Sequence, residues 1–153
     1  MTQATAVVFG VGDVNGVGGA ACLRFAREGY HVLVAGRTPA KIEKVVEAVR
    51  EAGKGSAEAV PTDVTDEAQV IAAFDRAMNP GQGRAPADVV ISNAGNNAII
   101  DFTTLSAAQF EDFWRVGCYS GFLVGREAAR RLLPLGRGTV IFTGASGSLR
   151  GKP

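Results

Sequence analysis

Short apolar runs alternate with amphipathic stretches along this chain. Residues 4–9 form a β-branched, apolar run that ends at glycines, which is typical of a strand buried on both faces. Residues 16–28 then carry apolar positions at helical spacing, and residues 31–35 and 39–52 repeat the strand and helix signals. These patterns predict two consecutive β-α units.

The same alternation continues to the end of the chain. Strands that alternate with helices predict a parallel sheet with helices on both faces, because right-handed crossovers leave few other topologies. We therefore expect one α/β domain over residues 1–153, a doubly wound and Rossmann-like sheet. The further elements are expected to be a strand at 57–61, a helix at 66–78 with Thr65 as its N-cap, a polar loop at 79–86, a strand that begins at 88–92, a long helix at 106–133 and a fifth strand at 139–143.

Composition excludes several classes of protein. Hydrophobic residues make up 46% of the chain and charged residues 20%, which is too apolar for a disordered protein. A net charge of +1 without a Lys/Arg run argues against nucleic acid as a partner. Residues 1–9 show neither a basic leader nor a long apolar run, so we expect no membrane span and a cytoplasmic location. Cys22 and Cys118 lack metal-ligand spacing and are expected to be free thiols, with no metal site.

A glycine cluster follows the first predicted strand, where residues 10–19 read GVGDVNGVGG. Glycines at this place let the backbone turn sharply and keep side chains away from a diphosphate, while the amide groups at the helix start face the anion. A tight turn with a close helix contact would need glycines as well. The spacing is GxxxGxG, formed by Gly12, Gly16 and Gly18.

With this spacing the chain resembles the short-chain dehydrogenase/reductase family over essentially its whole length. Further motifs follow in the family's order: Asp63-Val64 after the third strand, Asn93-Ala94-Gly95 after the fourth, and residues 138–143, which look like the strand that carries the active-site serine. The resemblance implies a sheet order of 3-2-1-4-5, which is incomplete relative to the family. It also implies an oxidoreductase that exchanges hydride between a nicotinamide cofactor and a carbonyl or alcohol. The cofactor contacts that it implies are Gly12, Asn15, Gly16, Val17, Gly18, Asp63, Val64, Asn93, Ala94 and Gly95.

The end of the second predicted strand favours NADP over NAD. A carboxylate there would accept hydrogen bonds from the ribose 2′-hydroxyl and would repel a 2′-phosphate. This chain has Gly36 instead, followed by Arg37, whose guanidinium can pair with a phosphate in bidentate geometry. We therefore expect Arg37 to bind NADP(H); a solvated arginine that opens a loop is the alternative.

The catalytic part of the resemblance is incomplete. In the family, the tyrosine of a YxxxK motif is the general acid/base, and the lysine lowers the tyrosine pKa. Tyr30 and Tyr119 have no lysine four residues later, so both are expected to be packing residues. The family's tyrosine and lysine would fall beyond residue 153.

Two further family positions can be placed. Ser146 is expected to orient the substrate oxygen, with Ser148 as the competing choice and an ordinary turn serine as the alternative. The family's asparagine, which holds a proton-relay water, falls on Cys118, whose thiol cannot replace both the donor and the acceptor of an amide. His31, the only histidine, has no evident carboxylate or metal partner and is expected to be structural.

Three hypotheses follow for the function. The first is an NADP(H)-dependent oxidoreductase in its complete form, the second a nucleotide-binding or regulatory protein without turnover, and the third a truncated product without function. The strand at 139–143 is uncharged, β-prone and placed at a sheet edge. We therefore expect self-association through this strand or through the aromatic residues of the helix at 106–133.

Overall fold

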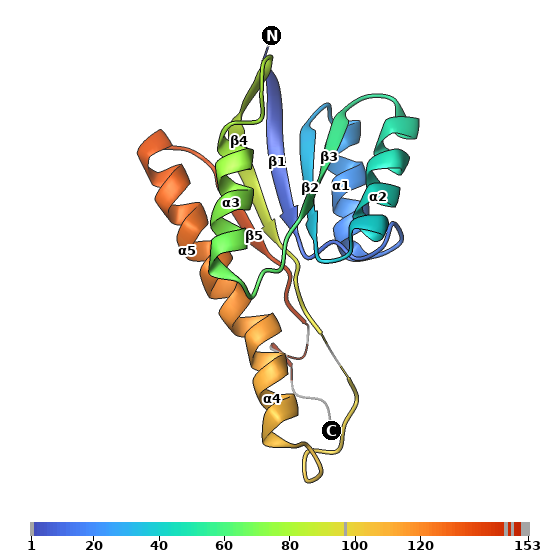
Figure 1. Ribbon diagram of the computed structural model, residues 1–153, viewed down its shortest axis with the longest axis vertical. Helices are drawn as coiled ribbons and strands as arrows, with labels where there is room; N and C mark the ends of the chain where they lie inside the picture. The colour runs from blue at the N-terminus through green and yellow to red at the C-terminus, as the bar shows by residue number, and fades with distance from the viewer. Residues whose placement is uncertain (1, 97, 146, 148, 151–153) are drawn as a thin grey trace.

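The computed structural model describes residues 2–96, 98–145, 147, 149 and 150. Its strands form one parallel sheet in the order β3-β2-β1-β4-β5, as predicted, with helices on both faces (Figure 1). The elements are β1 (Gln3–Phe9), α1 (Val17–Arg27), β2 (His31–Gly36), α2 (Pro39–Ala52), β3 (Ser56–Pro61), α3 (Glu67–Met78), β4 (Arg84–Ser92), α4 (Ala107–Trp114), a π-helical turn (Arg115–Tyr119), α5 (Ser120–Leu132), a 3-10 turn (Leu133–Leu135) and β5 (Thr139–Phe142).

The apolar runs of β1 and β2 are buried on both faces of the sheet. Ala6, Val8 and their neighbours pack under α1 and α2, whereas Val7 and Phe9 pack under α3 and α5. Alternate residues of one strand thus serve two separate cores, which explains why these strands read as continuous apolar runs rather than alternating ones. Each fully buried valine or phenylalanine contributes roughly 1.5–3 kcal/mol of transfer free energy, so the central strands anchor the loops that follow them.

Strand β5 differs from the central strands because its residues are exposed along its whole length. It pairs with β4 from Val89↔Thr139 to Ser92↔Phe142 and lies at the edge of the sheet in Figure 1. Val140 and Ile141 are 38% and 43% exposed, respectively. A groove of about 460 Å³ runs beside the strand, lined mainly by residues of the α5 end and the following turn. An uncovered apolar edge of this kind is where another chain can pair.

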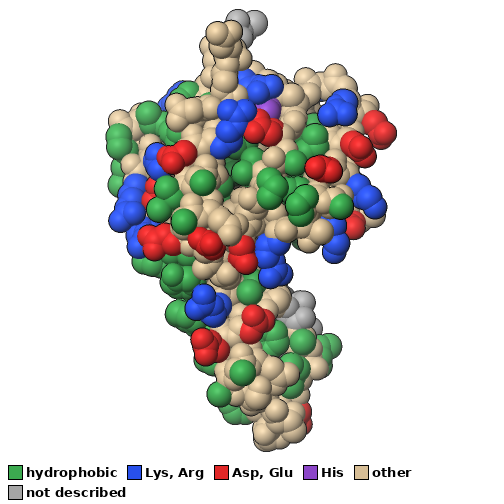
Figure 2. Space-filling view, in the orientation of Figure 1, with side chains coloured by type: hydrophobic (Ala, Val, Ile, Leu, Met, Phe, Trp, Pro, Cys, Tyr) green, Lys and Arg blue, Asp and Glu red, His purple; other side chains and the backbone are tan. Residues whose placement is uncertain are grey.

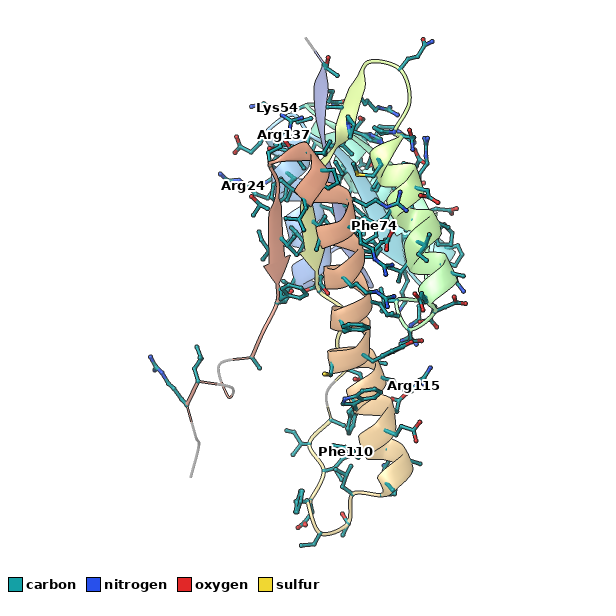
Figure 3. The ribbon with its side chains drawn as sticks, turned by 90° about the vertical axis from the view of Figure 1, so that its left-hand side faces the viewer. Arg24, Lys54, Phe74, Phe110, Arg115 and Arg137 are labelled. Atoms are coloured by element: carbon teal, nitrogen blue, oxygen red, sulfur yellow. The ribbon has the colours of Figure 1, made fainter. Side chains whose placement is uncertain are left out.

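The long helix predicted at 106–133 is present, but a π-helical turn interrupts it. Ser106 and Gln109 form a capping box at its start, and the α4 part extends beyond the sheet (Figures 1 and 3). The Ser120 hydroxyl donates a hydrogen bond to the carbonyl of Val116, one turn back. A serine that bonds the carbonyl four residues earlier competes with the backbone ladder, which is consistent with a wider turn at this place.

Several predicted boundaries differ from the structure, and two of these differences have a clear physical reason. The N-cap of α3 is Asp66 and not Thr65: the Asp66 carboxylate accepts from the amides of Ala68 and Gln69 at 2.9 and 3.2 Å. Aspartate is the better cap because its charge also suits the positive end of the helix dipole. Strand β4 begins at Arg84, inside the predicted loop at 79–86, because the tip of the long β1 strand supplies a partner there.

His31 lies at the opposite end of the sheet from the glycine loop, and it has the carboxylate neighbour that the sequence did not reveal. Its Nδ1 lies 2.8 Å from the Ser56 hydroxyl, and its Nε2 lies 3.9 Å from a Glu58 carboxylate oxygen. Glu58 in turn accepts two 2.6 Å hydrogen bonds from Arg76. Burial, aided by the Arg84 charge, lowers the pKa of His31 to about 4, so the ring is neutral at physiological pH.

Candidate functional site

A crevice of about 200 Å³ opens at the carboxyl ends of the central strands. Strand order reverses between β1 and β4, and in open α/β sheets ligands bind in the crevice at such a switch point. Loops that follow β1, β2, β3 and β4 converge there, and the π-helical turn covers one side. The lining residues are Gly10, Val11, Gly12, Arg37, Thr38, Lys41, Thr62, Val64, Ala94, Gly95 and Val116.

The glycine loop contributes glycines with different roles. A Cβ at Gly12 would meet no atom within 4 Å, so this glycine leaves space above the backbone. A Cβ at Gly18 would lie 3.2 Å from Cα of Val11 and 3.0 Å from the side-chain Nδ2 of Asn93, so this glycine lets α1 start close against the sheet. The loop is held by the amides of Gly16 and Asn15, which donate to the carbonyl and carboxylate of Asp13 at 3.2 and 2.9 Å.

Gly36 ends β2 under the same loop and is buried. A Cβ at this position would lie 2.1 Å from the carbonyl oxygen of Val11 and 2.8 Å from Cγ2 of Ile42. Such distances leave no room for a side chain unless the loop moves. The amide of Val11 donates to Ala35 at 3.0 Å, which holds the loop against β2. The end of β2 is thus closed to a side chain by packing.

Two cationic side chains lie at the rim of the crevice, where helix α2 begins. Arg37 precedes the N-cap, Thr38, and Lys41 lies in the first turn; both cations are exposed and line the crevice. The Thr38 hydroxyl makes no capping hydrogen bond, and the first turn contains no acidic residue. Among the described residues, neither Arg37 nor Lys41 forms an ion pair. Sequence reasoning missed Lys41, although a base in a first helical turn, where acids are preferred, was a usable signal.

Asn93 ties three strand ends together beneath the crevice. Its side-chain amide donates to the carbonyl of Gly10 at 3.1 Å, and its side-chain oxygen accepts from the Thr143 hydroxyl at 2.9 Å. Gly10 has φ +80°, and a Cβ there would lie 2.3 Å from the amide nitrogen of Ala94. The ends of β1, β4 and β5 are therefore held in contact with one another. These contacts fix the backbone that forms the floor of the crevice, where Gly95 lies.

The loop after β3 supplies one side of the crevice. Val64 is almost fully buried and lines it, whereas Asp63 does not. The Asp63 carboxylate accepts from the amide and hydroxyl of Thr65 at 2.9 and 2.8 Å, and its amide donates to Gln69 at 2.8 Å. These bonds fold the loop into the start of α3, so the local role of Asp63 is to shape this loop.

The predicted catalytic positions are less well represented. Ser146 and its competitor Ser148 lie outside the described residues. Cys118 is exposed in the π-helical turn, two residues from Val116 of the crevice wall. Tyr119 stacks on Trp114 with ring centroids 5.6 Å apart, and Tyr30 meets Phe25 edge to face at 5.2 Å. Both tyrosines thus make the packing contacts that were expected.

Thiols and metal ligands add no second site in the described part of the chain. Cys22 lies on the buried face of α1, and burial raises the pKa of its thiol to about 12, which makes it unreactive; both cysteines are free. No group of three or more His, Cys, Asp or Glu residues is arranged to hold a metal ion there. None of the helices described is both long enough and apolar enough to cross a bilayer.

The crevice brings together five of the residues that the sequence singled out. Gly12, Arg37, Val64, Ala94 and Gly95 line it. Gly10, Val11, Thr38, Lys41, Thr62 and Val116 line it as well and were not predicted. The predicted residues that do not line it are Asn15, Gly16, Val17, Gly18, Asp63 and Asn93.

Comparisons with known proteins agree with this architecture. The family model for short chain dehydrogenases matches residues 5–153. An uncharacterized oxidoreductase of Bacillus subtilis, YuxG, is 37% identical over 140 residues, which are 90% of this chain and 20% of that protein. Gluconate 5-dehydrogenase of Gluconobacter oxydans is 29% identical over 133 residues, which are 85% of this chain and 49% of that protein.

A solved structure gives the same result. The crystal structure of a short-chain dehydrogenase from Rhodopseudomonas palustris superposes with a TM-score of 0.85 and 35% identity, and the match covers 97% of this chain and 67% of that one. The chain spans about half or less of the two curated relatives named above. Because the family model and this structure both match nearly every residue, the chain belongs to the short-chain dehydrogenase family.

Proposed function

We propose that this protein, in its complete form, is an NADP(H)-dependent oxidoreductase that exchanges hydride with a small carbonyl compound or alcohol. The observation that supports it is the crevice at the switch point, which joins an open glycine loop to the unpaired guanidinium of Arg37. Backbone amides at a helix start and a free guanidinium are the groups that bind phosphate esters. A dinucleotide cofactor carries phosphate groups that these amides and this guanidinium could bind.

Steric closure at Gly36 supports NADP over NAD. A carboxylate that would hold the ribose 2′-hydroxyl of NAD has no space there, because its Cβ would lie 2.1 Å from the Val11 carbonyl oxygen. The next residue, Arg37, faces the crevice with its charge unpaired within the described chain. A carboxylate at position 36 would repel a 2′-phosphate, whereas the guanidinium of Arg37 attracts it. The absence of the acid and the presence of the base therefore both favour NADP.

Residues of this chain would bind and orient the cofactor. Gly12 and Gly95 keep the crevice floor free of side chains, and Asn93 fixes that floor from below. When bound, the nicotinamide cofactor would supply hydride exchange with the substrate carbon. Ser146 is proposed to hold the carbonyl oxygen in place.

Direct binding is the first test. Calorimetry should register NADP⁺ or NADPH binding to the wild type, a clear preference over NAD⁺, and a loss of that preference in Arg37→Gln. Lys44→Gln is the matched control, because Lys44 is exposed on the same helix and does not line the crevice. No heat with any of the nucleotides would refute the proposal. NADPH oxidation with a panel of carbonyl compounds then tests turnover, and binding without turnover would assign the chain a nucleotide-binding role alone.

We also propose that the chain self-associates through the exposed β5 edge or through the α4–α5 face. Ile141→Lys places a charge on the exposed strand and should shift sedimentation toward the monomer, because a lysine on an edge strand opposes pairing. Ile99→Lys is the control, because the Ile99 side chain is fully exposed and lies between β4 and α4. If the wild type is already a monodisperse monomer, the self-association proposal is wrong.

A further inference from the structure

We propose that Lys41 is a second determinant of cofactor choice, one that binds the ribose 2′-phosphate of NADP(H) together with Arg37. This inference rests on the proposed function and adds to it a specificity residue that neither the glycine motif nor the end of β2 contains. Lys41 and Arg37 line the same crevice, on either side of the α2 N-cap, and both are exposed there.

The charge of the ribose 2′-phosphate is larger than one cation can neutralise. A phosphate monoester carries a charge of roughly −1.5 to −2 at neutral pH, because its second pKa is near 6. The single positive charge of Arg37 leaves such a group partly unneutralised, whereas Arg37 and Lys41 together match it. The planar guanidinium suits two oxygens of the phosphate, and the flexible ammonium can reach a third as a point charge.

The position of Lys41 is unfavourable without an anion. The amino end of a helix carries a partial positive charge, so a cation in the first turn is opposed by the dipole. The first turn of α2 contains no acid to offset it, and no ion pair to Lys41 exists among the residues described. Helix α3 shows the usual alternative, since Asp66 caps it and Glu67 lies in its first turn. A bound phosphate would supply the missing negative charge at α2.

Lys41→Gln tests this role because it keeps most of the side-chain length and removes the charge. NADP⁺ and NAD⁺ dissociation constants are measured by calorimetry for the wild type, Lys41→Gln, Arg37→Gln and the control Lys44→Gln. We expect Lys41→Gln to weaken NADP⁺ binding about tenfold, the cost of one charge-assisted contact, and to leave NAD⁺ binding within about twofold. Added salt should weaken NADP⁺ binding less steeply in Lys41→Gln than in the wild type.

Thermal unfolding of the unliganded variant separates binding from a structural role. If Lys41 acts on the 2′-phosphate, the melting temperature of Lys41→Gln should equal or exceed that of the wild type, because an unfavourable dipole contact has been removed. Unchanged NADP⁺ affinity, or an equal loss for NADP⁺ and NAD⁺, would overturn the role of Lys41 while Arg37→Gln still reports on the proposed function. A wild type that binds neither nucleotide would overturn both proposals.

Discussion

The two ends of this sheet differ in whether their polar side chains are paired with one another. At the amino end of β2 and β3, polar side chains are paired with one another: His31 with Ser56, and Glu58 with Arg76. At the carboxyl end, the backbone itself is packed through glycines, and the cations at the rim, Arg37 and Lys41, have no ion-pair partner within the described chain. On the face drawn in Figure 2, acidic and basic side chains are scattered rather than gathered in one patch.

This difference indicates which polar groups stabilise the fold and which are available to bind a ligand. Side chains that already form hydrogen bonds stabilise the fold, although Nε2 of His31 has no hydrogen-bond partner among the described residues. Unpaired cations above a floor of glycines do little for the fold, but they are available to an anion. We therefore expect mutations at the amino end to change stability, mutations of the rim to change binding, and mutations of the packed floor to affect the fold most.

The largest effect is expected at the floor. Gly36→Ala should destabilise the protein by about 3 kcal/mol, because the new Cβ would be forced to within 2.1 Å of the Val11 carbonyl oxygen in a packed region. Chemical denaturation measures the change. Gly12→Ala is the matched control, since its Cβ would have free space; its fold should tolerate the methyl group while its crevice becomes narrower. Equal stability of the two variants would mean that the loop adapts freely, and the proposed steric closure against NAD would lose its basis.

The next effect concerns pH and His31. Burial lowers the pKa of His31 in the folded state from 6.5 to about 4. Between these two pH values the imidazole is protonated in the unfolded chain and neutral in the folded protein. Stability should therefore fall as the pH drops from about 6.5 toward 4, by up to about 3 kcal/mol, at about 1.4 kcal/mol for each pKa unit. Unfolding free energies of the wild type and His31→Asn, measured across this range, isolate the effect, because carboxylates titrate in both proteins. Parallel pH curves would contradict the prediction.

A smaller effect is expected at the Glu58–Arg76 pair. Glu58→Gln should cost about 1 kcal/mol, because the pair is bidentate but 32% and 41% exposed, respectively, and therefore screened by water. The Glu58 charge also raises the pKa of His31, so Glu58→Gln should lower that pKa further. Chemical denaturation gives the first value and NMR titration of the imidazole the second. A His31 pKa that rises in the variant would show that Glu58 acts in another way.

Local patterns predicted the alternation of strands and helices, and the family resemblance implied the sheet order. Buried strands, helix stops and the glycine spacing are readable along the chain. Five of the eleven residues that line the crevice were predicted: Gly12 and Arg37 from the residues themselves, and Val64, Ala94 and Gly95 from the family resemblance. Predictions failed where contacts between distant segments decide the outcome. The carboxylate beside His31 comes from β3, and the early start of β4 at Arg84 depends on pairing with the tip of β1.

The π-helical turn and the role of Asn93 show the same limit. A side chain that bonds its own helix, as Ser120 does with Val116, can be suspected from sequence, but the resulting change of helix type depends on the surrounding packing. Asn93 was predicted from its motif as a cofactor contact, which stays a prediction. Its bonds to Gly10 and Thr143 join strand ends that are 83 and 50 residues away along the chain, and no local pattern indicates them.

The smallest effect on stability, and the sharpest test of the comparison, is expected at Arg37. Arg37→Gln should change the free energy of unfolding of the unliganded protein by no more than about 0.5 kcal/mol, since the side chain is exposed and forms no ion pair within the described residues. Saturating NADPH should raise the melting temperature of the wild type by mass action, and much less so that of Arg37→Gln at the same concentration. Lys44→Gln should behave like the wild type in both measurements. A large loss of stability in the unliganded Arg37→Gln variant would place Arg37 among the fold's own contacts, and the rim of the crevice would then resemble the paired amino end.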